Sequence, residues 1–409
     1  MKPPAGSAAA SETAASGSPP AADPPPPRLA GESPRPLLAA ETLRPLLAIE
    51  STCDETAAAI IHPDGRVLGQ SIATQDRLHE RFAGVVPEIA ARGHVEAILP
   101  VVDRALRTAG VDGPTLSAIA VADRPGLAGS LLVGMTAAKS LALAWDLPLI
   151  AINHLHAHLY ACRMSADVVA TNAAENVTVD ATAGTVDAAA GDADVYPALG
   201  LVVSGGHSSM YRCDGPLELR YLGGTIDDAV GEAFDKVGAM LGLPFPGGPA
   251  VSRLAARGDR AAFAFPRSMT RKSDGDDFSF SGLKTAVRYA ITGGGNVDPK
   301  TVQVEPDRAA DICASFEAAV VETVMTKALR AAKREGLRVI LVGGGVAANA
   351  YLRDRLRAAA GRDAIRVIVA DPALCTDNAA MGAIAWEHYR RGDFASSDAD
   401  ITPGLQRGF

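Results

Sequence analysis

Three of the eight histidines in this chain stand within five residues of one another, directly after an apolar stretch at 147–152. A neutral imidazole is the commonest transition-metal ligand among side chains. The apolar stretch predicts a strand that leads into a helix, on which His154 and His158 share one face, about 5–6 Å apart at Cβ. The spacing favours a metal site as much as it favours two solvated histidines at a strand-to-helix corner. A metal site here needs a carboxylate from elsewhere in the chain.

Two further residues bear on that site. On a helix, His156 lies about 200° around the axis from His154, which argues against a third ligand, whereas an extended segment would bring all three rings to one side. Asp377 is the candidate carboxylate and stands where the last predicted helix begins. An aspartate at a helix start is ordinarily an N-cap, so this position alone favours a structural role.

Two stretches share one pattern, which is a strand, a bend of small polar residues and a second strand. They cover 45–61 and 199–211, and their bends contain Asp54 and Glu55 in the first and Ser204, Gly205 and Gly206 in the second. Backbone N–H groups at such a bend can converge on a phosphate, although glycine-rich hairpin turns are also ordinary structure. The repetition favours a phosphate-binding role.

Each hairpin is followed by helical and strand patterns, which predict an α/β fold made of two similar blocks. The expected helices cover 86–106, 124–145, 309–332, 350–360 and 377–386, and the expected strands cover 116–121, 338–342 and 365–370. Gly343, Gly345 and Ala348 also satisfy the G-x-G-x-x-G/A pattern of dinucleotide-binding turns. That alternative is weak, because the acid Asp371 lies beyond the usual spacing of about 20 residues and nothing in the chain resembles a hydride-transfer site.

Length and composition limit the protein class. With 409 residues, 48% of them hydrophobic and 21% charged, the chain is long enough for a large core and two domains. Residues 1–44 are dominated by Ala, Pro, Ser and Gly and predict a disordered tail, whose balanced charges are unlike those of a transit peptide. Five scattered cysteines fit a reduced cytoplasmic protein. No apolar run reaches the roughly 18 residues of a membrane span.

A second low-complexity stretch, 165–195, contains six acidic residues and no Lys or Arg. Removing these six acids changes the formal net charge from −8 to −2. The remainder is therefore near neutral, which neither demands nor excludes a local basic face for nucleic acid. We expect this acidic insertion to loop away from any RNA.

Ten short motifs follow one another along the chain. They are Ile-Glu-Ser-Thr-Cys-Asp-Glu-Thr at 49–56, Gly-Val-Val-Pro-Glu at 84–88, Pro-Gly-Leu at 125–127 with Leu-Leu-Val-Gly at 131–134, Asn-His at 153–154 with His158, Val-Ser-Gly-Gly-His at 203–207, Asp-Asp-Ala-Val-Gly-Glu-Ala-Phe-Asp-Lys at 227–236, Pro-Gly-Gly-Pro at 246–249, Phe-Ser-Phe-Ser-Gly-Leu-Lys-Thr at 278–285, Gly-Gly-Val-Ala-Ala-Asn at 344–349 and Cys-Thr-Asp-Asn at 375–378. From about Leu46 to Phe394, apart from the acidic insertion, the chain resembles the tRNA N6-adenosine threonylcarbamoyltransferase family (TsaD or Gcp, formerly labelled O-sialoglycoprotein endopeptidase).

The resemblance implies an actin-like ATPase (ASKHA) superfold, in which two duplicated α/β domains face each other across a nucleotide cleft. We accordingly divide the chain into a tail at 1–44, a first domain at 45–150, a metal-ligand helix with the acidic insertion at 151–198, a second domain at 199–394 and a C-terminal tail at 395–409. The resemblance also implies that His154, His158 and Asp377 hold one divalent metal ion, with Fe²⁺ preferred over Zn²⁺. The residues implied to line the site for threonylcarbamoyl-adenylate are Val202, Val203, Ser204, Gly205, Gly206, Asp235, Gly248 and Asn349.

The implied reaction transfers the threonylcarbamoyl group from threonylcarbamoyl-AMP to N6 of the adenosine 3′ of the anticodon, in tRNAs that read codons beginning with A. The metal ion would orient the acyl group and polarise its carbonyl, while the glycine turns would receive the departing phosphate. Asp54 and Glu55 are candidates for a role in the chemistry, and no catalytic residue is assigned. The alternative is a small-molecule kinase or ATPase of the same superfold, which needs no histidine pair.

The resemblance also implies partners and a location. The partners are tRNA, a paralogous actin-like subunit of the TsaB type and a P-loop ATPase of the TsaE type, in the cytoplasm and without a membrane. One departure from the family pattern is Arg124, which stands where a glycine is usual before Pro125-Gly126 and places a guanidinium near the cleft. The older peptidase label does not fit a His-Glu-x-x-His site, because Leu155 follows His154.

Overall fold

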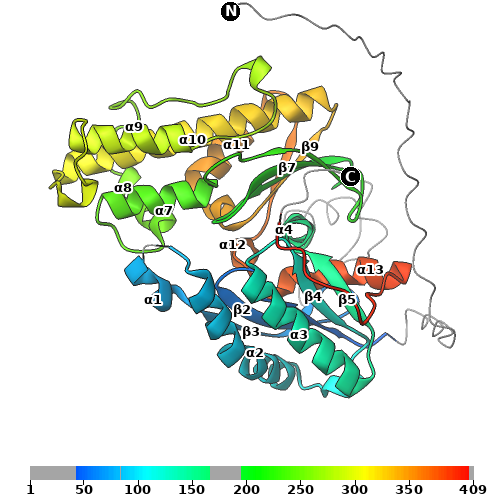
Figure 1. Ribbon diagram of the computed structural model, residues 1–409. Coiled ribbons are helices and arrows are strands. Elements are labelled where there is room, and N and C mark those ends of the chain that lie inside the picture. The colour runs from blue at the N-terminus through cyan, green and yellow to red at the C-terminus, as the bar shows by residue number, and fades with distance from the viewer. Residues whose placement is uncertain (1–42, 83, 166–194, 405–409) are drawn as a thin grey trace, which may run out of the picture. The chain divides into compact units, whose positions relative to one another are not determined.

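The computed structural model describes residues 43–82, 84–165 and 195–404. Within these residues, ten strands form two five-stranded sheets (Figure 1). The first sheet contains β1 (Leu46–Glu50), β2 (Glu55–Ile61), β3 (Val67–Thr74), β4 (Ile119–Arg124) and β5 (Leu149–Asn153). The second sheet contains β6 (Ala198–Val203), β7 (Ser208–Cys213), β8 (Leu219–Gly224), β9 (Val339–Gly343) and β10 (Arg366–Val369).

The two sheets have the same topology. Their strand orders are β3-β2-β1-β4-β5 and β8-β7-β6-β9-β10. In each sheet the first three strands form an antiparallel meander, and the last two run parallel to the first. The prediction of an α/β fold with two duplicated blocks is therefore confirmed, and β1 to β5 correspond in order to β6 to β10.

Helices connect and cover the strands. The first block contains α1 (Asp76–His79), α2 (Pro87–Ala109), α3 (Ala128–Trp145) and α4 (His154–Arg163), with 3₁₀ turns η2 (Glu80–Phe82) and η3 (Gly113–Thr115). The second block contains α7 (Val230–Met240), α8 (Gly247–Ala255), α9 (Ser281–Thr292), α10 (Pro306–Arg334), α11 (Ala350–Gly361), α12 (Pro372–Cys375) and α13 (Ala385–Arg391), with 3₁₀ turns η4 (Lys272–Asp274), η5 (Pro299–Thr301), η6 (Gly345–Ala348) and η7 (Ala379–Ile384). The predicted last helix at 377–386 therefore begins as a 3₁₀ turn.

Side chains alternate across the first sheet, as the period of a strand requires. Leu47 and Ile49 of β1 pack into a core that also contains residues of α2 and α3. Leu46 and Ala48 point to the opposite face, into a core shared with α4, η7, α13 and the second sheet. The central strands of the first sheet are thus buried on both faces, and one of the sheet's two cores joins the blocks.

Each block contributes an element near its C-terminal end to the other block. Helix α4 follows β5 of the first sheet but packs against β6 and β9 of the second. The η7 turn follows β10 and α12 of the second block but packs against β1 and β2 of the first, and it also contacts α4. Residues at the starts of α4 and η7, which are far apart in sequence, are thereby brought together between the two sheets.

Some expectations fall on residues that the structure does not describe. These are most of the predicted tail at 1–44, nearly all of the acidic insertion and the last five residues, so those expectations and the domain boundaries stay predictions. Among the described helices, α3 is long and apolar enough to cross a membrane by length and composition, and 33% of it is buried within the fold.

Candidate functional site

His154, His158 and Asp377 meet where α4 and η7 begin. The Nε2 atom of His158 lies 3.1 Å from Oδ1 of Asp377, and the Nε2 atom of His154 lies 3.5 Å from the same oxygen. One potential ligand atom from each residue lies within 4.8 Å of the other two. Both imidazoles are buried. The structure therefore brings together the three side chains that the sequence suggested as metal ligands.

The ordinary role for Asp377, capping a helix, is performed by its neighbour. The side chain of Asn378 accepts hydrogen bonds from the backbone N–H groups of Ala380 and Met381. At the start of α4 the corresponding cap is Asn153, which accepts from Leu155 and His156. Because both caps are supplied by asparagines, the Asp377 carboxylate is left to face the two histidines.

A second carboxylate orients His154. The Nδ1 atom of His154 lies 3.1 Å from Oε2 of Glu50 and 3.2 Å from Oγ1 of Thr52, while Oε1 of Glu50 accepts a hydrogen bond from the Thr52 N–H. A carboxylate on Nδ1 fixes the ring orientation and leaves Nε2 as the ligand atom, as in many histidine metal sites. Glu50 lies in the motif at 49–56, but the sequence assigned it no role, although an acid at the end of a buried apolar strand was the available signal.

The protonation states follow from burial and these neighbours. Burial alone would lower the pKa of His154, but the carboxylates of Asp377 and Glu50 raise it to about 9. Burial alone would raise the pKa of Asp377, but His154 and His158 hold it well below its ordinary value. A metal ion at this position would displace the proton that the two carboxylates favour on His154, because only a neutral imidazole binds a metal. Two imidazole nitrogens and one carboxylate oxygen that converge in this way form a donor set that fits Zn²⁺ or Fe²⁺.

His156 is not part of this cluster. Because α4 is helical from His154 onward, the His156 ring points elsewhere and lies 6.1 Å from the ring of Tyr211. Burial, with a contribution from Arg124, lowers the pKa of His156 to about 4. Residue 156 therefore lies on a helix and not on an extended segment, and its ring is on a different face from the rings of His154 and His158.

His207 is a site residue that histidine spacing could not reveal. It lies in the turn between β6 and β7, and its ring centroid is 6.1 Å from that of His154. Burial and the nearby His154 lower its pKa to about 3, so the ring is neutral. The second predicted phosphate-binding turn therefore reaches the histidine cluster.

The turn between β6 and β7 is fixed by hydrogen bonds at Ser204 and is exposed at Gly205 and Gly206. The Oγ atom of Ser204 accepts a hydrogen bond from the N–H of His207, and its carbonyl accepts one from Gly231 at the start of α7. Gly205 and Gly206 are exposed, and a Cβ atom at either would meet nothing within 4 Å. Their backbone N–H groups are the part of this turn available to an anion.

The two valines before the turn can contribute only backbone atoms to a binding site. The side chains of Val202 and Val203 are fully buried in the core, so only their backbone can approach a ligand. Gly344 packs closely beneath them, because a Cβ atom there would lie 2.4 Å from the Val203 carbonyl oxygen, and its φ of 93° also favours glycine.

Asp235 and Gly248 contact each other directly. The Oδ1 atom of Asp235 accepts hydrogen bonds from the N–H groups of Gly247 (2.7 Å) and Gly248 (3.3 Å) at the start of α8. Burial raises the pKa of Asp235. These residues therefore fix the start of α8 against α7.

Asn349 uses its amide within the protein. Its Nδ2 atom donates to Ser252 Oγ and Glu317 Oε1, at 2.9 and 2.8 Å, and its Oδ1 accepts the N–H of Leu352 as the cap of α11. Both amide hydrogens of Asn349, a residue implied to line the adenylate site, are therefore engaged by other protein groups. As the structure stands, Asn349 joins α8, α10 and α11.

The first hairpin bend is strongly acidic. Carboxylate oxygens of Asp54, Glu55 and Asp76 lie within 4.8 Å of one another. Burial, followed by the charges of Asp377 and Asp54, raises the pKa of Glu55 well above its ordinary value.

The dinucleotide-binding alternative does not match the local structure. A Cβ atom on Gly343 would lie 2.4 Å from the carbonyl oxygen of His158, so this glycine permits β9 to pack against α4. The 3₁₀ turn η6, and not an α-helix, follows Gly344. Gly343 therefore permits the close packing that positions His158, one of the candidate metal ligands.

Comparisons with known proteins agree with this structure. The family model described as tRNA N6-adenosine threonylcarbamoyltransferase matches residues 66–192 and 173–384. A protein of that name from Rhodopirellula baltica is 58% identical over 369 residues, covering 88% of this chain and 96% of its own length. Another from Anaeromyxobacter sp. is 45% identical over 356 residues, covering 87% and 97%.

Solved structures show the same fold at low sequence identity. Full-length HypF in its phosphate- and nucleotide-bound form superposes with a TM-score of 0.53 at 15% identity, covering 89% of this chain and 58% of HypF. HypF from T. kodakarensis gives 0.51 at 14% identity, covering 85% and 48%. These likenesses support the actin-like ATPase superfold. Since the family model matches most of the chain and a relative shares 58% of its residues, the chain belongs to the tRNA N6-adenosine threonylcarbamoyltransferase family.

Proposed function

We propose that this protein transfers the threonylcarbamoyl group from threonylcarbamoyl-AMP to N6 of the adenosine 3′ of the anticodon in tRNA. The observation that carries the proposal is the buried cluster of His154, His158 and Asp377 beside an open glycine turn, in a chain that spans 96% of its Rhodopirellula baltica relative. The tRNAs are those that read codons beginning with A, and the protein acts in the cytoplasm.

One divalent metal ion, Fe²⁺ or Zn²⁺, is proposed to bind His154 Nε2, His158 Nε2 and an oxygen of Asp377. Such an ion would supply Lewis-acid chemistry that polarises an acyl carbonyl. Glu50 and Thr52 hold the His154 ring in the ligand orientation. Gly343 of β9 packs closely against the carbonyl of His158, and this contact holds α4 and His158 against the second sheet.

The protein's own groups are assigned as follows. The exposed N–H groups of Gly205 and Gly206 receive the adenylate phosphate, on which negative charge builds as AMP departs. Asp235 fixes the start of α8, with Gly248, at the edge of the nucleotide site. Glu55, in the first hairpin bend beside Asp54, is assigned a role in the chemistry.

A kinase or ATPase acting on a small molecule is not favoured. Such an enzyme would share the phosphate-binding turns but would have no use for a buried pair of histidines that converges on an aspartate. The relatives that match this chain over most of its length are named as tRNA-modifying transferases.

Reconstitution tests the proposal. The chain, its partner proteins and the enzyme that makes the adenylate are incubated with ATP, threonine, bicarbonate and tRNA, and the digested tRNA is analysed for threonylcarbamoyladenosine by mass spectrometry. We expect the nucleoside to form only when the chain is present. Metal analysis of the purified chain should give one equivalent, lost in His158→Ala and kept in His156→Ala, which removes an imidazole from the other face of α4.

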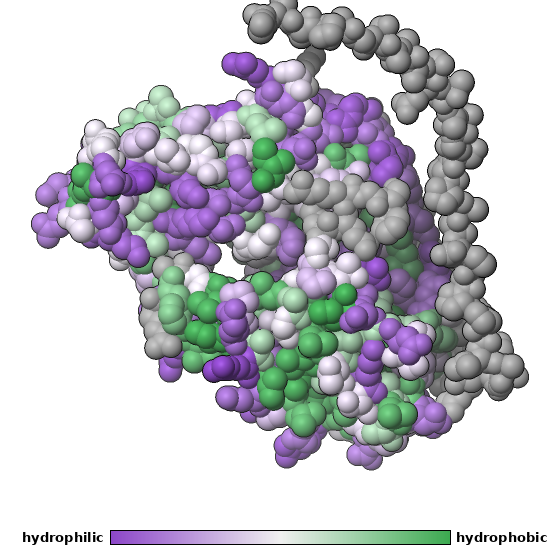
Figure 2. All heavy atoms as spheres, viewed as in Figure 1, coloured by the Kyte–Doolittle hydropathy of each residue, from purple (hydrophilic) through white to green (hydrophobic). Residues whose placement is uncertain are grey.

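The partners are proposed to be a paralogous actin-like subunit and a P-loop ATPase. Helices α2 and α3 pack side by side and expose large apolar side chains, namely Val95 (64%), Leu99 (60%), Leu132 (52%) and Leu143 (86%). Figure 2 shows apolar residues gathered over these helices. An apolar patch of this kind marks a protein interface, and we assign it to the paralogous subunit rather than to a membrane.

A further inference from the structure

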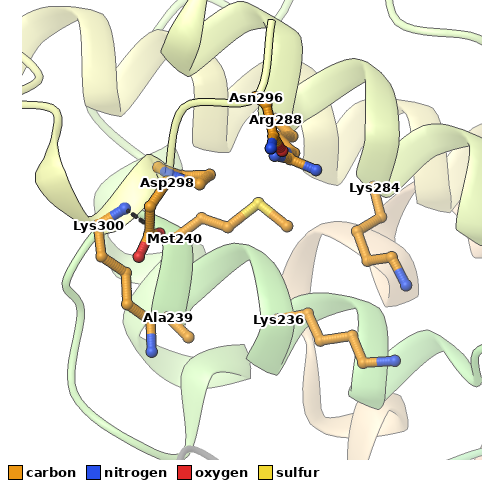
Figure 3. Close-up of a pocket in the computed structure, with 9 residues that line it drawn as sticks. Lys236, Ala239, Met240, Lys284, Arg288, Asn296, Asp298 and Lys300 are labelled. Atoms are coloured by element: carbon orange, nitrogen blue, oxygen red, sulfur yellow. Dashed lines mark hydrogen bonds between the residues drawn. The ribbon is translucent and has the colours of Figure 1, made fainter.

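The second block carries a basic pocket that the reaction assigned above does not use. It has a volume of about 510 Å³ and lies between α7, α9 and the segment that leads into η5 (Figure 3). Its lining residues are Lys236, Ala239, Met240, Lys284, Arg288, Asn296, Asp298, Pro299 and Lys300. Four of these side chains are cationic and one is acidic, in a protein whose formal net charge is −8. The pocket is therefore locally basic, in a protein that is acidic as a whole.

Two of the sequence motifs converge at this pocket. Lys236 ends the motif at 227–236 and Lys284 lies in the motif at 278–285. Their ammonium groups bind the two oxygens of Asp228, at 2.7 and 2.6 Å. Lys236 also pairs with Oε1 of Glu232 at 2.8 Å, so two carboxylates hold both lysines at one side of the pocket and balance their charges.

The other two cations are not neutralised in this way. Arg288 lies one helical turn beyond Lys284, on the same face of α9. Its Nη2 donates to the Val297 carbonyl, and its Nε is buried without a hydrogen-bond partner among the described residues. Lys300 projects from the opposite side, and its backbone N–H donates to Asp298. Neither Arg288 nor Lys300 forms an ion pair with a carboxylate in the described part of the chain.

We propose that this pocket binds a backbone phosphate of the tRNA substrate, outside the reaction centre, a proposal that rests on the function proposed above. An Arg and Lys cluster is the chemistry by which proteins hold phosphate oxygens, and such contacts set the position of a nucleic acid rather than read its bases. Met240 lies between the two sides of the pocket and offers an apolar surface to a ribose.

The adenylate is the less suitable occupant. Its phosphate is assigned to the open turn at Gly205 and Gly206. On α7, Asp235 points to the start of α8, whereas the next residue, Lys236, points to Asp228 and the pocket. The basic pocket is therefore adjacent to Asp235, which is assigned to the nucleotide site, but it opens away from that residue. A long substrate such as tRNA could contact both places.

The test compares Arg288→Ala, Lys300→Ala and the double variant with Arg355→Ala, which removes an exposed cation from α11. Binding of transcribed tRNA to the full chain is measured at several salt concentrations, together with KM values for tRNA and for threonylcarbamoyl-AMP in the reconstituted reaction. We expect each pocket variant to weaken tRNA binding by about tenfold and to reduce the slope of log K against log salt by about 1. Arg355→Ala should bind like the wild type.

The outcomes separate this proposal from the function itself. If the wild type makes no threonylcarbamoyladenosine, the proposed function fails. If the wild type is active but the pocket variants bind tRNA like Arg355→Ala, the pocket is not an RNA contact. A rise in KM for threonylcarbamoyl-AMP alone would assign the pocket to the adenylate and also overturn the proposal. Thermal unfolding shows whether a variant has lost its fold, and Arg288→Lys, which keeps the charge, should recover part of the affinity.

Discussion

At the scale of residues, His158 and Asp377 stand 219 positions apart in the chain, yet Nε2 of one lies 3.1 Å from Oδ1 of the other. The helical spacing of His154 and His158 was legible in the sequence, and the family motifs pointed to Asp377. Glu50 and His207 were not anticipated as neighbours of His154, because a contact between distant segments leaves no spacing to recognise. The engaged amide of Asn349 was hidden for the same reason, since its partners Ser252 and Glu317 lie on other helices.

Gly343→Ala tests how closely the candidate ligands depend on packing. The added Cβ would lie 2.4 Å from the carbonyl oxygen of His158, so α4 or β9 must shift. A displacement of His158 misplaces one ligand atom, and we expect a loss of metal affinity of at least tenfold. The measurement is metal content after dialysis against a graded chelator.

The matched control is Gly345→Ala, where a Cβ atom meets nothing within 4 Å. It should retain metal as the wild type does. Equal retention by both variants would mean that the β9 contact does not position His158.

At the scale of elements, α4 and η7 matter because each leaves its own block and packs on the other. Strand and helix periodicity predicted most elements to within a few residues, including α10, α11 and β10. It did not predict that the last helix begins as the 3₁₀ turn η7, nor that Asn378 and not Asp377 caps it. Nor could periodicity show that α4 packs on the second sheet, since a helix's apolar residues do not identify which sheet they meet.

Asp228→Asn tests the link between α7 and α9. Burial alone would raise the pKa of Asp228, but hydrogen bonds from Lys236 and Lys284 lower it. A lowered pKa means that the stabilisation is present above the unfolded pKa of about 3.9 and is lost as pH falls through the folded pKa. We expect Asp228→Asn to reduce the free energy of unfolding by about 1–2 kcal/mol at pH 7.

Urea unfolding from pH 7 down to pH 3 measures this effect. The difference between wild type and variant should shrink below about pH 4. A difference that stays constant across this range would show that the carboxylate charge is not what joins the two helices.

At the scale of the whole molecule, two blocks of equal topology surround one shared core, and the exposed faces of α2 and α3 lie away from it. Sequence repetition predicted the duplication, because two hairpins of the same pattern recur 150 or so residues apart. The apolar outer face was not predicted. In the sequence, Leu99 and Leu143 follow the usual spacing of apolar residues on a helix. Only their exposed fractions of 60% and 86% show that they lie on the protein surface and not in a core.

The double variant Leu99→Lys and Leu143→Lys tests this face as the site of the paralogous subunit. Both side chains are exposed, so the fold should remain and the thermal midpoint should change little. Binding of the paralogous subunit, measured by size-exclusion chromatography, should be lost, because two buried charges would lack partners in the complex.

Val67→Lys on β3 is the control, since that exposed apolar residue lies on the sheet edge and not on α2 or α3. It should leave the complex intact. Persistence of the complex in the double variant would assign the partner to another surface.

The most direct test of the proposed function is the tRNA of a bacterial strain that lacks its own family member, kept alive by conditional expression and complemented with this chain. Threonylcarbamoyladenosine is quantified by mass spectrometry after the conditional copy is depleted. We predict that wild-type chain restores the modified nucleoside and that His158→Ala, although folded, does not. Equal amounts of the nucleoside with and without this chain would contradict the proposed function.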